Sequence, residues 1–139
     1  MREIKFRVWD TINKEWDTSD TATIDLDGTI LVDGGSCCYL DGSLILCQFT
    51  GLKDKNGVEI WEGDILLSTN DMYPDGFKSK WAAKHAVMYD PDIATFGMSD
   101  DGYLPLSMTF DQDYRGGEGK TIFKVIGNIH ENPELLETP

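Results

Sequence analysis

Basic side chains are the scarcest feature of this sequence. Its 139 residues include 12 Lys and Arg against 25 Asp and Glu, which gives a net charge of −13 at neutral pH. A surface of that average charge repels a nucleic-acid backbone. A nucleic-acid partner is therefore disfavoured, unless the few basic residues gather on one face.

Cysteines and long apolar runs are also scarce. The three cysteines, Cys37, Cys38 and Cys47, are an odd number, and the adjacent pair is poorly placed to form a bridge or a metal clip. The first ten residues, MREIKFRVWD, contain no apolar run long enough for a signal peptide or a membrane helix. These features predict a cytoplasmic protein with reduced thiols and no membrane partner.

The chain does contain enough apolar material for a core. Hydrophobic residues make up 40% of it and aromatic residues 11%, which makes global disorder improbable. The apolar residues occur in short segments separated by turn signals, without an internal repeat and without regular alternation of strands and helices. This pattern predicts a mostly β fold with α+β character at its margins.

The first 49 residues read as a β meander. Apolar and charged side chains alternate over residues 4–9, the period of a half-buried strand, and residues 11–15 form a turn into a short strand around Trp16. Residues 21–26 and 29–32 flank Asp27-Gly28, a dipeptide that favours a tight hairpin turn.

Residues 50–139 read as a small SH3-like or related β-barrel. Turn signals at Asn56-Gly57 and at residues 62–64 precede the apolar segment 65–67. Residues 81–89 combine helix-favouring and strand-favouring side chains, and we predict a strand. The predicted domains are 1–49 and 50–139, with one continuous domain as the alternative.

The barrel is expected to end in one more strand and a short helical turn. Residues 121–129 form the predicted strand, in which Gly127 marks a bulge or a close approach of another segment. Asn132 and Pro133 suit the start of a helical turn, whose apolar side chains are Leu135 and Leu136.

One segment resembles a catalytic motif. The segment 25–29 (DLDGT) resembles the first motif of haloacid-dehalogenase-type phosphohydrolases, in which the first Asp is the nucleophile and the second a general acid beside Mg²⁺. That chemistry requires a hydrophobic strand before the motif and an α/β scaffold, and neither is present in the sequence. A hairpin turn is the favoured reading, and a metal-dependent phosphohydrolase using Asp25 and Asp27 is the alternative.

Three weaker signals lead to no predicted site. Residues 115–121 resemble the end of a P-loop, but Tyr114 stands where a glycine is required. Residues 111–122 match part of a calcium loop but lack several of its oxygen ligands, and the two histidines have no cysteine at metal-ligand spacing. We predict no catalytic residue, no cofactor and no metal site.

Three segments together resemble the YopX-like family of phage and prophage proteins. They are residues 1–10 (MREIKFRVWD), 48–66 (QFTGLKDKNGVEIWEGDIL) and 123–136 (FKVIGNIHENPELL). The resemblance implies a shared β-rich fold and a place in the cytoplasm of a bacterial host. It implies no activity, because the family carries no established one.

The acidity is concentrated in one stretch. Seven Asp and Glu residues lie between Glu15 and Asp41, whereas no basic residue occurs between Lys14 and Lys53. Such a run either keeps a surface soluble or binds a basic partner. The functional hypothesis is a non-enzymatic module that binds a host or phage protein with a basic surface, and that self-associates through an exposed strand edge. The candidate binding residues are Asp17, Asp20, Asp25 and Asp27.

Overall fold

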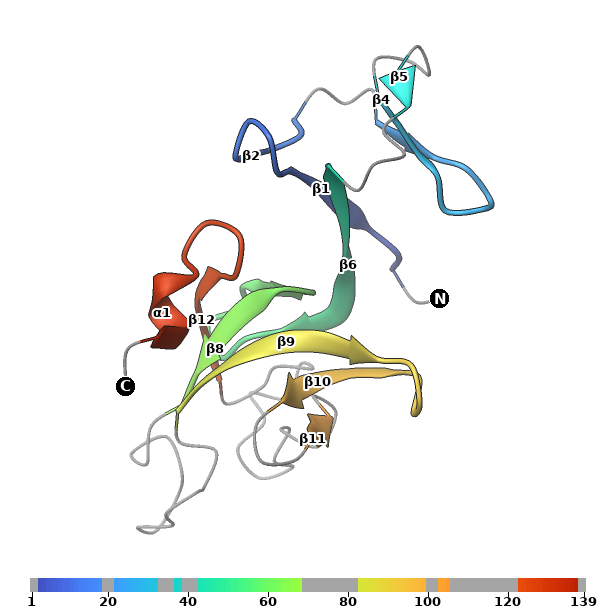
Figure 1. Cartoon of the computed structure of the whole chain (residues 1–139). Coiled ribbons are helices and arrows are strands. Elements are labelled where there is room, and N and C mark those ends of the chain that lie inside the picture. The colour runs from blue at the N-terminus through green and yellow to red at the C-terminus, as the bar shows by residue number, and fades with distance from the viewer. Residues whose placement is uncertain are drawn as a thin grey trace, which may run out of the picture. The chain divides into compact units, whose positions relative to one another are not determined.

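The computed structural model describes residues 3–18, 22–32, 37–38, 43–68, 83–99, 103–105 and 123–137. The chain divides into an N-terminal unit, Lys5–Gln48, and a C-terminal unit, which comprises Phe49–Pro139 and Met1–Ile4. Strand β6 (Leu44–Lys53) passes from the first unit into the second (Figure 1). The predicted division into two domains stays a prediction, because a separation into units does not establish independent folding.

The N-terminal unit begins with an antiparallel ribbon. Strand β1 (Phe6–Asp10) pairs with β2 (Glu15–Trp16) on one side and with the first half of β6 on the other. Trp9 faces Trp16 across the ribbon with ring centroids 5.0 Å apart, and the Arg7 guanidinium lies 4.1 Å from the Trp16 ring centroid. Edge-to-face rings and a cation over a ring face both stabilise such a pair. The predicted first strand and hairpin are confirmed.

The turn between β1 and β2 is closed by the Asp10 side chain. Asp10 Oδ1 accepts hydrogen bonds from the backbone N–H groups of Ile12 and Asn13, at 2.8 and 3.0 Å. Its Oδ2 accepts from the Asn13 side chain at 2.7 Å. These bonds hold the pKa of Asp10 below its ordinary value, the Asn13 backbone N–H having the largest effect.

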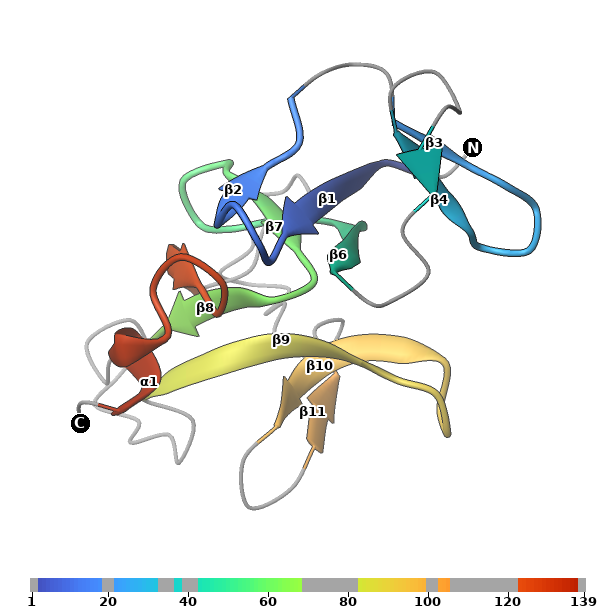
Figure 2. The same cartoon turned by 45° about the horizontal axis from the view of Figure 1, so that its top comes forward.

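A second, smaller antiparallel sheet completes the described part of this unit. It has the order β3-β4-β5, with bounds Thr23–Ile24, Ile30–Val32 and Cys37–Cys38. The β3–β4 hairpin, which carries the DLDGT segment, belongs to this short sheet and not to the sheet of β1 and β2 (Figure 2).

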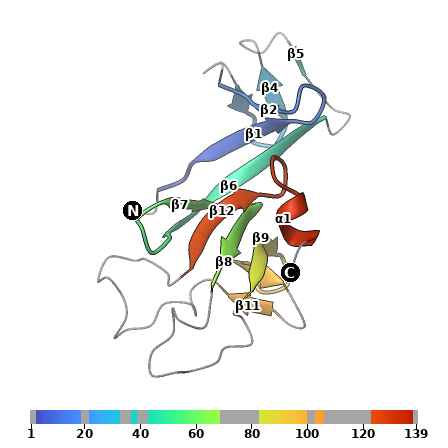
Figure 3. The same ribbon diagram turned by 90° about the vertical axis from the view of Figure 1, so that its left-hand side faces the viewer.

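The C-terminal unit is built on a curled, half-barrel antiparallel sheet with the order β11-β10-β9-β8-β12 (Figure 3). The strands are β8 (Asp64–Leu67), β9 (Lys84–Asp90), β10 (Thr95–Ser99), β11 (Tyr103–Pro105) and β12 (Lys124–Asn128), and β7 (Glu59–Trp61) pairs with the second half of β6. The mostly β fold class is confirmed. The strand expected over residues 81–89 is confirmed as β9, although residues 81 and 82 lie outside the described ranges.

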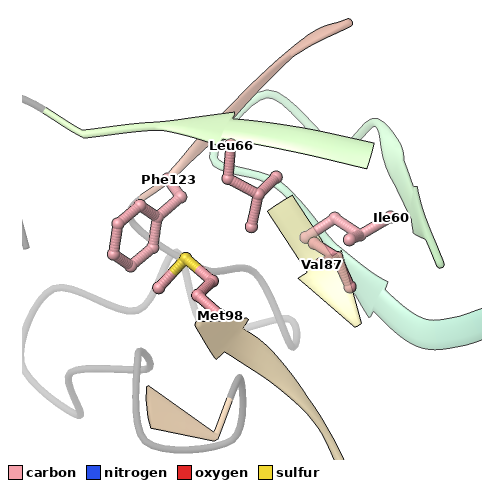
Figure 4. Packing of buried hydrophobic residues seen from close by; sticks show 5 residues of the cluster. All are labelled: Ile60, Leu66, Val87, Met98 and Phe123. Carbon is pink, nitrogen blue, oxygen red and sulfur yellow. The ribbon is translucent and has the colours of Figure 1, made fainter. Parts of the chain in front are cut away.

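The core of this unit lies on one face of the sheet (Figure 4). Its central side chains come from four different strands and from the residue preceding β12, and each is at most 2% exposed: Ile60, Leu66, Val87, Met98 and Phe123. Burial of a large apolar side chain contributes roughly 1.5–3 kcal/mol to stability. The core therefore depends on contacts between segments that are distant in the sequence.

A buried carboxylate joins the β6–β7 turn to β12. Asp54 is 1% exposed, and its Oδ1 accepts from the N–H groups of Asn56 and Val58 at 2.8 and 2.9 Å. Its Oδ2 accepts from the N–H of Val125, 71 residues away, at 3.0 Å. A buried charge is costly unless it is hydrogen-bonded, and three backbone donors meet that requirement here. Asp54 therefore fixes both the turn and its place against the sheet.

Gly127 lies at a bulge in β12, as predicted. The pairing of β12 with β8 shifts register between Val125 and Gly127. A Cβ added at Gly127 would lie 2.6 Å from Asn132 Oδ1 and 2.8 Å from Leu135 Cδ1, closer than real Cβ atoms approach. The missing side chain thus makes room for helix α1 (Glu134–Glu137), which packs beside β9 (Figure 3).

The short terminal helix is confirmed, but the Asn132 side chain acts differently from the predicted helix cap. Asn132 Oδ1 accepts from the N–H of Asn128 at 3.3 Å, while its backbone carbonyl accepts from the N–H of Leu135 at 3.0 Å. The side chain turns back toward β12 because the chain reverses tightly after Asn128. Asn128 Oδ1 itself accepts hydrogen bonds from the backbone N–H groups of His130 and Glu131. The Asn132 side chain therefore stabilises the reversal and does not cap the helix.

The turn at Gly63 also lies where the sequence placed it, directly before β8. The Gly63 N–H donates to Val87 O, and its carbonyl accepts from the N–H of Ile129, both at 2.8 Å. Its φ of +88° is in the left-handed region, and an added Cβ would lie 3.3 Å from His130 Nε2. The glycine thus lets the turn bond both to the middle of β9 and to the residue that follows β12.

In the described ranges, no helix has the length and apolar character needed to cross a membrane.

Candidate partner-binding surface

The acidic stretch is displayed on short strands and turns of the N-terminal unit. Glu15 is exposed at the start of β2, and Asp25 and Asp27 are exposed between β3 and β4. Asp20 lies outside the described residues, as do Asp33 and Asp41. The structure thus brings Asp25 and Asp27 together in one hairpin.

Asp17 differs from the other candidates in its exposure. It is half-buried directly after β2, where its N–H donates to Val8 O at 2.9 Å. A half-buried carboxylate at the end of a strand has less surface to offer a partner than one on a turn. The role of all four residues in binding stays a prediction.

The β3–β4 turn is ordered by its own hydrogen bonds. The Asp25 N–H donates to Thr29 O at 2.9 Å, and the Gly28 N–H donates to Asp25 O at 2.8 Å. Gly28 has a φ of +88°, the left-handed conformation that closes a three-residue hairpin loop. The hairpin predicted at Asp27-Gly28 is confirmed.

The Asp27 carboxylate is part of this turn. Its Oδ1 accepts from the Thr29 N–H at 2.9 Å. This backbone bond, followed by the Thr29 side chain, holds the pKa of Asp27 below its ordinary value of 3.8. Asp27 therefore carries its negative charge throughout the neutral range.

Leu26 is a feature of this surface that the sequence reasoning missed. It stands between the two carboxylates with a relative exposure of 110%, more than in an extended chain. Polar residues and glycine dominate turns, so a leucine inside the DLDGT segment was the available signal. The turn thus presents one large apolar side chain flanked by two negative charges.

The alternative hypothesis of a phosphohydrolase concerns the same residues, 25–29. Both residues of β3, which precedes Asp25, are exposed. A nucleophilic Asp in that class follows a buried strand, where fixed groups replace water around it. The hairpin placement agrees with the favoured reading, and the absence of turnover stays a prediction.

The remaining motifs lead to no described site. The P-loop-like residues 115–121 and the calcium-like residues 111–122 lie outside the described ranges. His85 is buried in β9, and His130 follows β12 beside Gly63. Where the structure describes the chain, no three His, Cys, Asp or Glu side chains are grouped as metal ligands would be.

Comparison with known proteins gives a consistent family assignment. The family model described as YopX protein matches residues 5–137. The crystal structure of protein EF1440 from Enterococcus faecalis is similar with a TM-score of 0.53 and 30% sequence identity, covering 98% of this chain and 99% of that one. The crystal structure of protein yopX from Bacillus subtilis is similar in fold, with a TM-score of 0.55, 18% identity and coverage of 100% and 99%. No curated protein matches the chain.

Proposed function

Because the chain belongs to the YopX protein family, we propose that it is a phage or prophage accessory protein that binds another protein and catalyses no reaction. It acts in the cytoplasm of the bacterial host. Its partner is a host or phage protein that presents a basic surface to the acidic stretch between Glu15 and Asp41.

The supporting observation is the display of Asp25 and Asp27 on an ordered, exposed turn. They lie in a sequence stretch that contains seven acidic residues and no basic one. A field of one sign raises the association rate with an oppositely charged partner more than it raises affinity, and salt screens it beyond about 10 Å at 0.1 M. Binding should therefore weaken as salt is added.

The exposure of the same carboxylates also favours binding over catalysis. Electrostatic catalysis requires preorganised groups in a site from which water is excluded. Asp25 and Asp27 are instead solvated on a hairpin turn. The test is hydrolysis of a generic phosphate ester with Mg²⁺ present; turnover that disappears in Asp25→Asn would contradict a non-enzymatic role.

Self-association through a strand edge is the second part of the proposal. Part of the β12 edge is already used inside the chain, because the Lys55 N–H donates to Phe123 O at 3.0 Å and Val125 N–H donates to Asp54. A second copy would therefore pair with another edge. Light scattering after size exclusion tests this, and a mass that stays monomeric at high concentration rejects it.

The central experiment is affinity capture from a bacterial lysate with mass spectrometry of the retained proteins. The test variant is Asp25→Lys with Asp27→Asn, which keeps an acceptor for the Thr29 N–H. The control is Asp92→Lys with Glu137→Gln, two exposed positions of the C-terminal unit that change the net charge by the same amount. Half-buried Asp17 is left unchanged, so that a loss of binding does not reflect a damaged fold.

The proposal expects basic proteins to be retained by wild type and by the control, and to be lost both at high salt and in the test variant. If retention is equal in the test and control variants, or does not respond to salt, the acidity serves solubility alone.

A further inference from the structure

The most exposed large apolar side chain among the described residues is Leu26, at the tip of the β3–β4 hairpin. Its relative exposure is 110%, against 66% for Ile12, the next highest. Isolated surface leucines are common and need no explanation. Leu26 differs because it projects completely from an ordered turn, between two carboxylates.

The fold makes no evident use of the Leu26 side chain. The turn is closed by backbone bonds of Asp25, Gly28 and Thr29 and by the Asp27 carboxylate. A side chain that buries no surface contributes nothing to the hydrophobic stabilisation of the chain. Leu26 is therefore available for contacts with another molecule.

We propose that Leu26 is the apolar anchor of the binding surface. It inserts into an apolar pocket of the partner protein, and Lys or Arg side chains at the rim of that pocket pair with Asp25 and Asp27. The inference rests on the proposed function and names the residue that supplies most of the affinity. In interfaces a few central, desolvated side chains dominate binding, and charged rims mainly set the rate and the specificity.

Charge complementarity selects this occupant over two others. A second copy of the chain carries a net charge of −13 and is repelled on average by an acidic tip. The cytoplasmic face of a membrane is also negative. A protein pocket that is apolar inside and basic at its rim complements both the exposed Leu26 side chain and the two flanking carboxylates.

The experiment uses a displayed library of random 12-residue peptides, selected on the immobilised full chain. The test variant is Leu26→Ser, and the matched control is Ile12→Ser, the same change in the β1–β2 turn of the same unit. Enriched peptides should combine Lys or Arg with a large apolar residue. Their affinity should fall at least about 10-fold for Leu26→Ser and remain unchanged for Ile12→Ser. The thermal midpoint of Leu26→Ser should equal that of wild type.

Further arms distinguish the outcomes. If Asp25→Lys with Asp27→Asn abolishes peptide binding but Leu26→Ser does not, the proposed role of Leu26 is wrong, and the proposed binding by the acidic surface is retained. If neither variant affects binding, both the anchor and the proposed function of this surface are wrong. Binding of wild type, but not of Leu26→Ser, to neutral phosphatidylcholine vesicles would overturn the protein partner in favour of a lipid surface. Leu26-dependent dimerisation would overturn it in favour of a second copy.

Discussion

Two turns of this protein have the same backbone hydrogen bonds and opposite surroundings. In residues 25–29 and in residues 54–58, the first Asp N–H donates to the carbonyl four residues later, and the N–H of the glycine donates to the Asp carbonyl. Gly28 and Gly57 have φ values of +88° and +85°. Both are three-residue hairpin loops that a glycine in the left-handed region completes.

Their side chains serve different purposes. In the second turn the Asp54 carboxylate is buried and bonds to Val125 of a distant strand. In the first turn Asp25 and Asp27 are exposed, and Leu26 contacts no other described segment. One local geometry can therefore position a core element or display a surface, according to what lies next to it.

The largest expected effect is at the buried turn. Asp54→Ala removes three hydrogen bonds to a buried carboxylate, each contributing about 1.5–3 kcal/mol, so a loss of roughly 3 kcal/mol or more is expected. Urea unfolding followed by tryptophan fluorescence measures it. Asp25→Ala, at the equivalent position of the exposed turn, should change stability by no more than about 0.5 kcal/mol. Equal losses in the two variants would show that the burial of Asp54 does not distinguish the two turns.

The next effect concerns the close approach at Gly127. Gly127→Ala places a Cβ against Asn132 and Leu135, and overpacking of this kind costs about 1–3 kcal/mol. Thermal unfolding measures the loss. Asn132→Gly removes the side chain that carries one of the two close atoms. The double variant should therefore lose less stability than the sum of the losses in the two single variants. An unchanged thermal midpoint in Gly127→Ala would show that α1 can shift freely.

A smaller effect is expected at Gly28. No atom lies within 4 Å of a Cβ added there, so only the positive φ opposes Gly28→Ala. The strain of an L-residue in this conformation is about 1–2 kcal/mol. Gly28→Asn should cost less, because Asn tolerates the left-handed region better. Alanine and asparagine variants of equal stability would indicate that the exposed turn opens and relieves the strain.

The smallest effect is on the titration of Asp27. Its pKa is held below the ordinary 3.8 by the Thr29 N–H and then by the Thr29 side chain. The folded state binds this proton more weakly than the unfolded state does, so the contribution to stability is present above the unfolded pKa and is lost as pH falls through the folded pKa. Thr29→Ala should move the pKa part of the way back, since the backbone donor remains. Carbon-detected NMR titration of the carboxyl group measures it, and a wild-type pKa of 3.8 or higher would contradict the bond.

The local features of this protein could be predicted from its amino-acid sequence. Asp27-Gly28 predicted the β3–β4 hairpin, because bonds between residues a few positions apart close that turn. Gly127 predicted the β12 bulge, because an isolated glycine in a strand marks a bulge or a close approach. Alternation over residues 4–9 predicted β1, because a period of two gives a strand one apolar face. The acidic stretch could be read directly, because a count of charges requires no structure.

Which of these local features are buried depends on tertiary contacts that the sequence pattern does not specify. The burial of Asp54 depends on Val125, which is 71 residues away, and the direction of the Asn132 side chain depends on the chain reversal at Asn128. Leu26 is apolar by sequence, yet its exposure follows from the absence of any described segment packed against the hairpin tip. Burial is a property of contacts between distant segments, and a periodic pattern of side chains specifies which face is apolar without specifying what covers it.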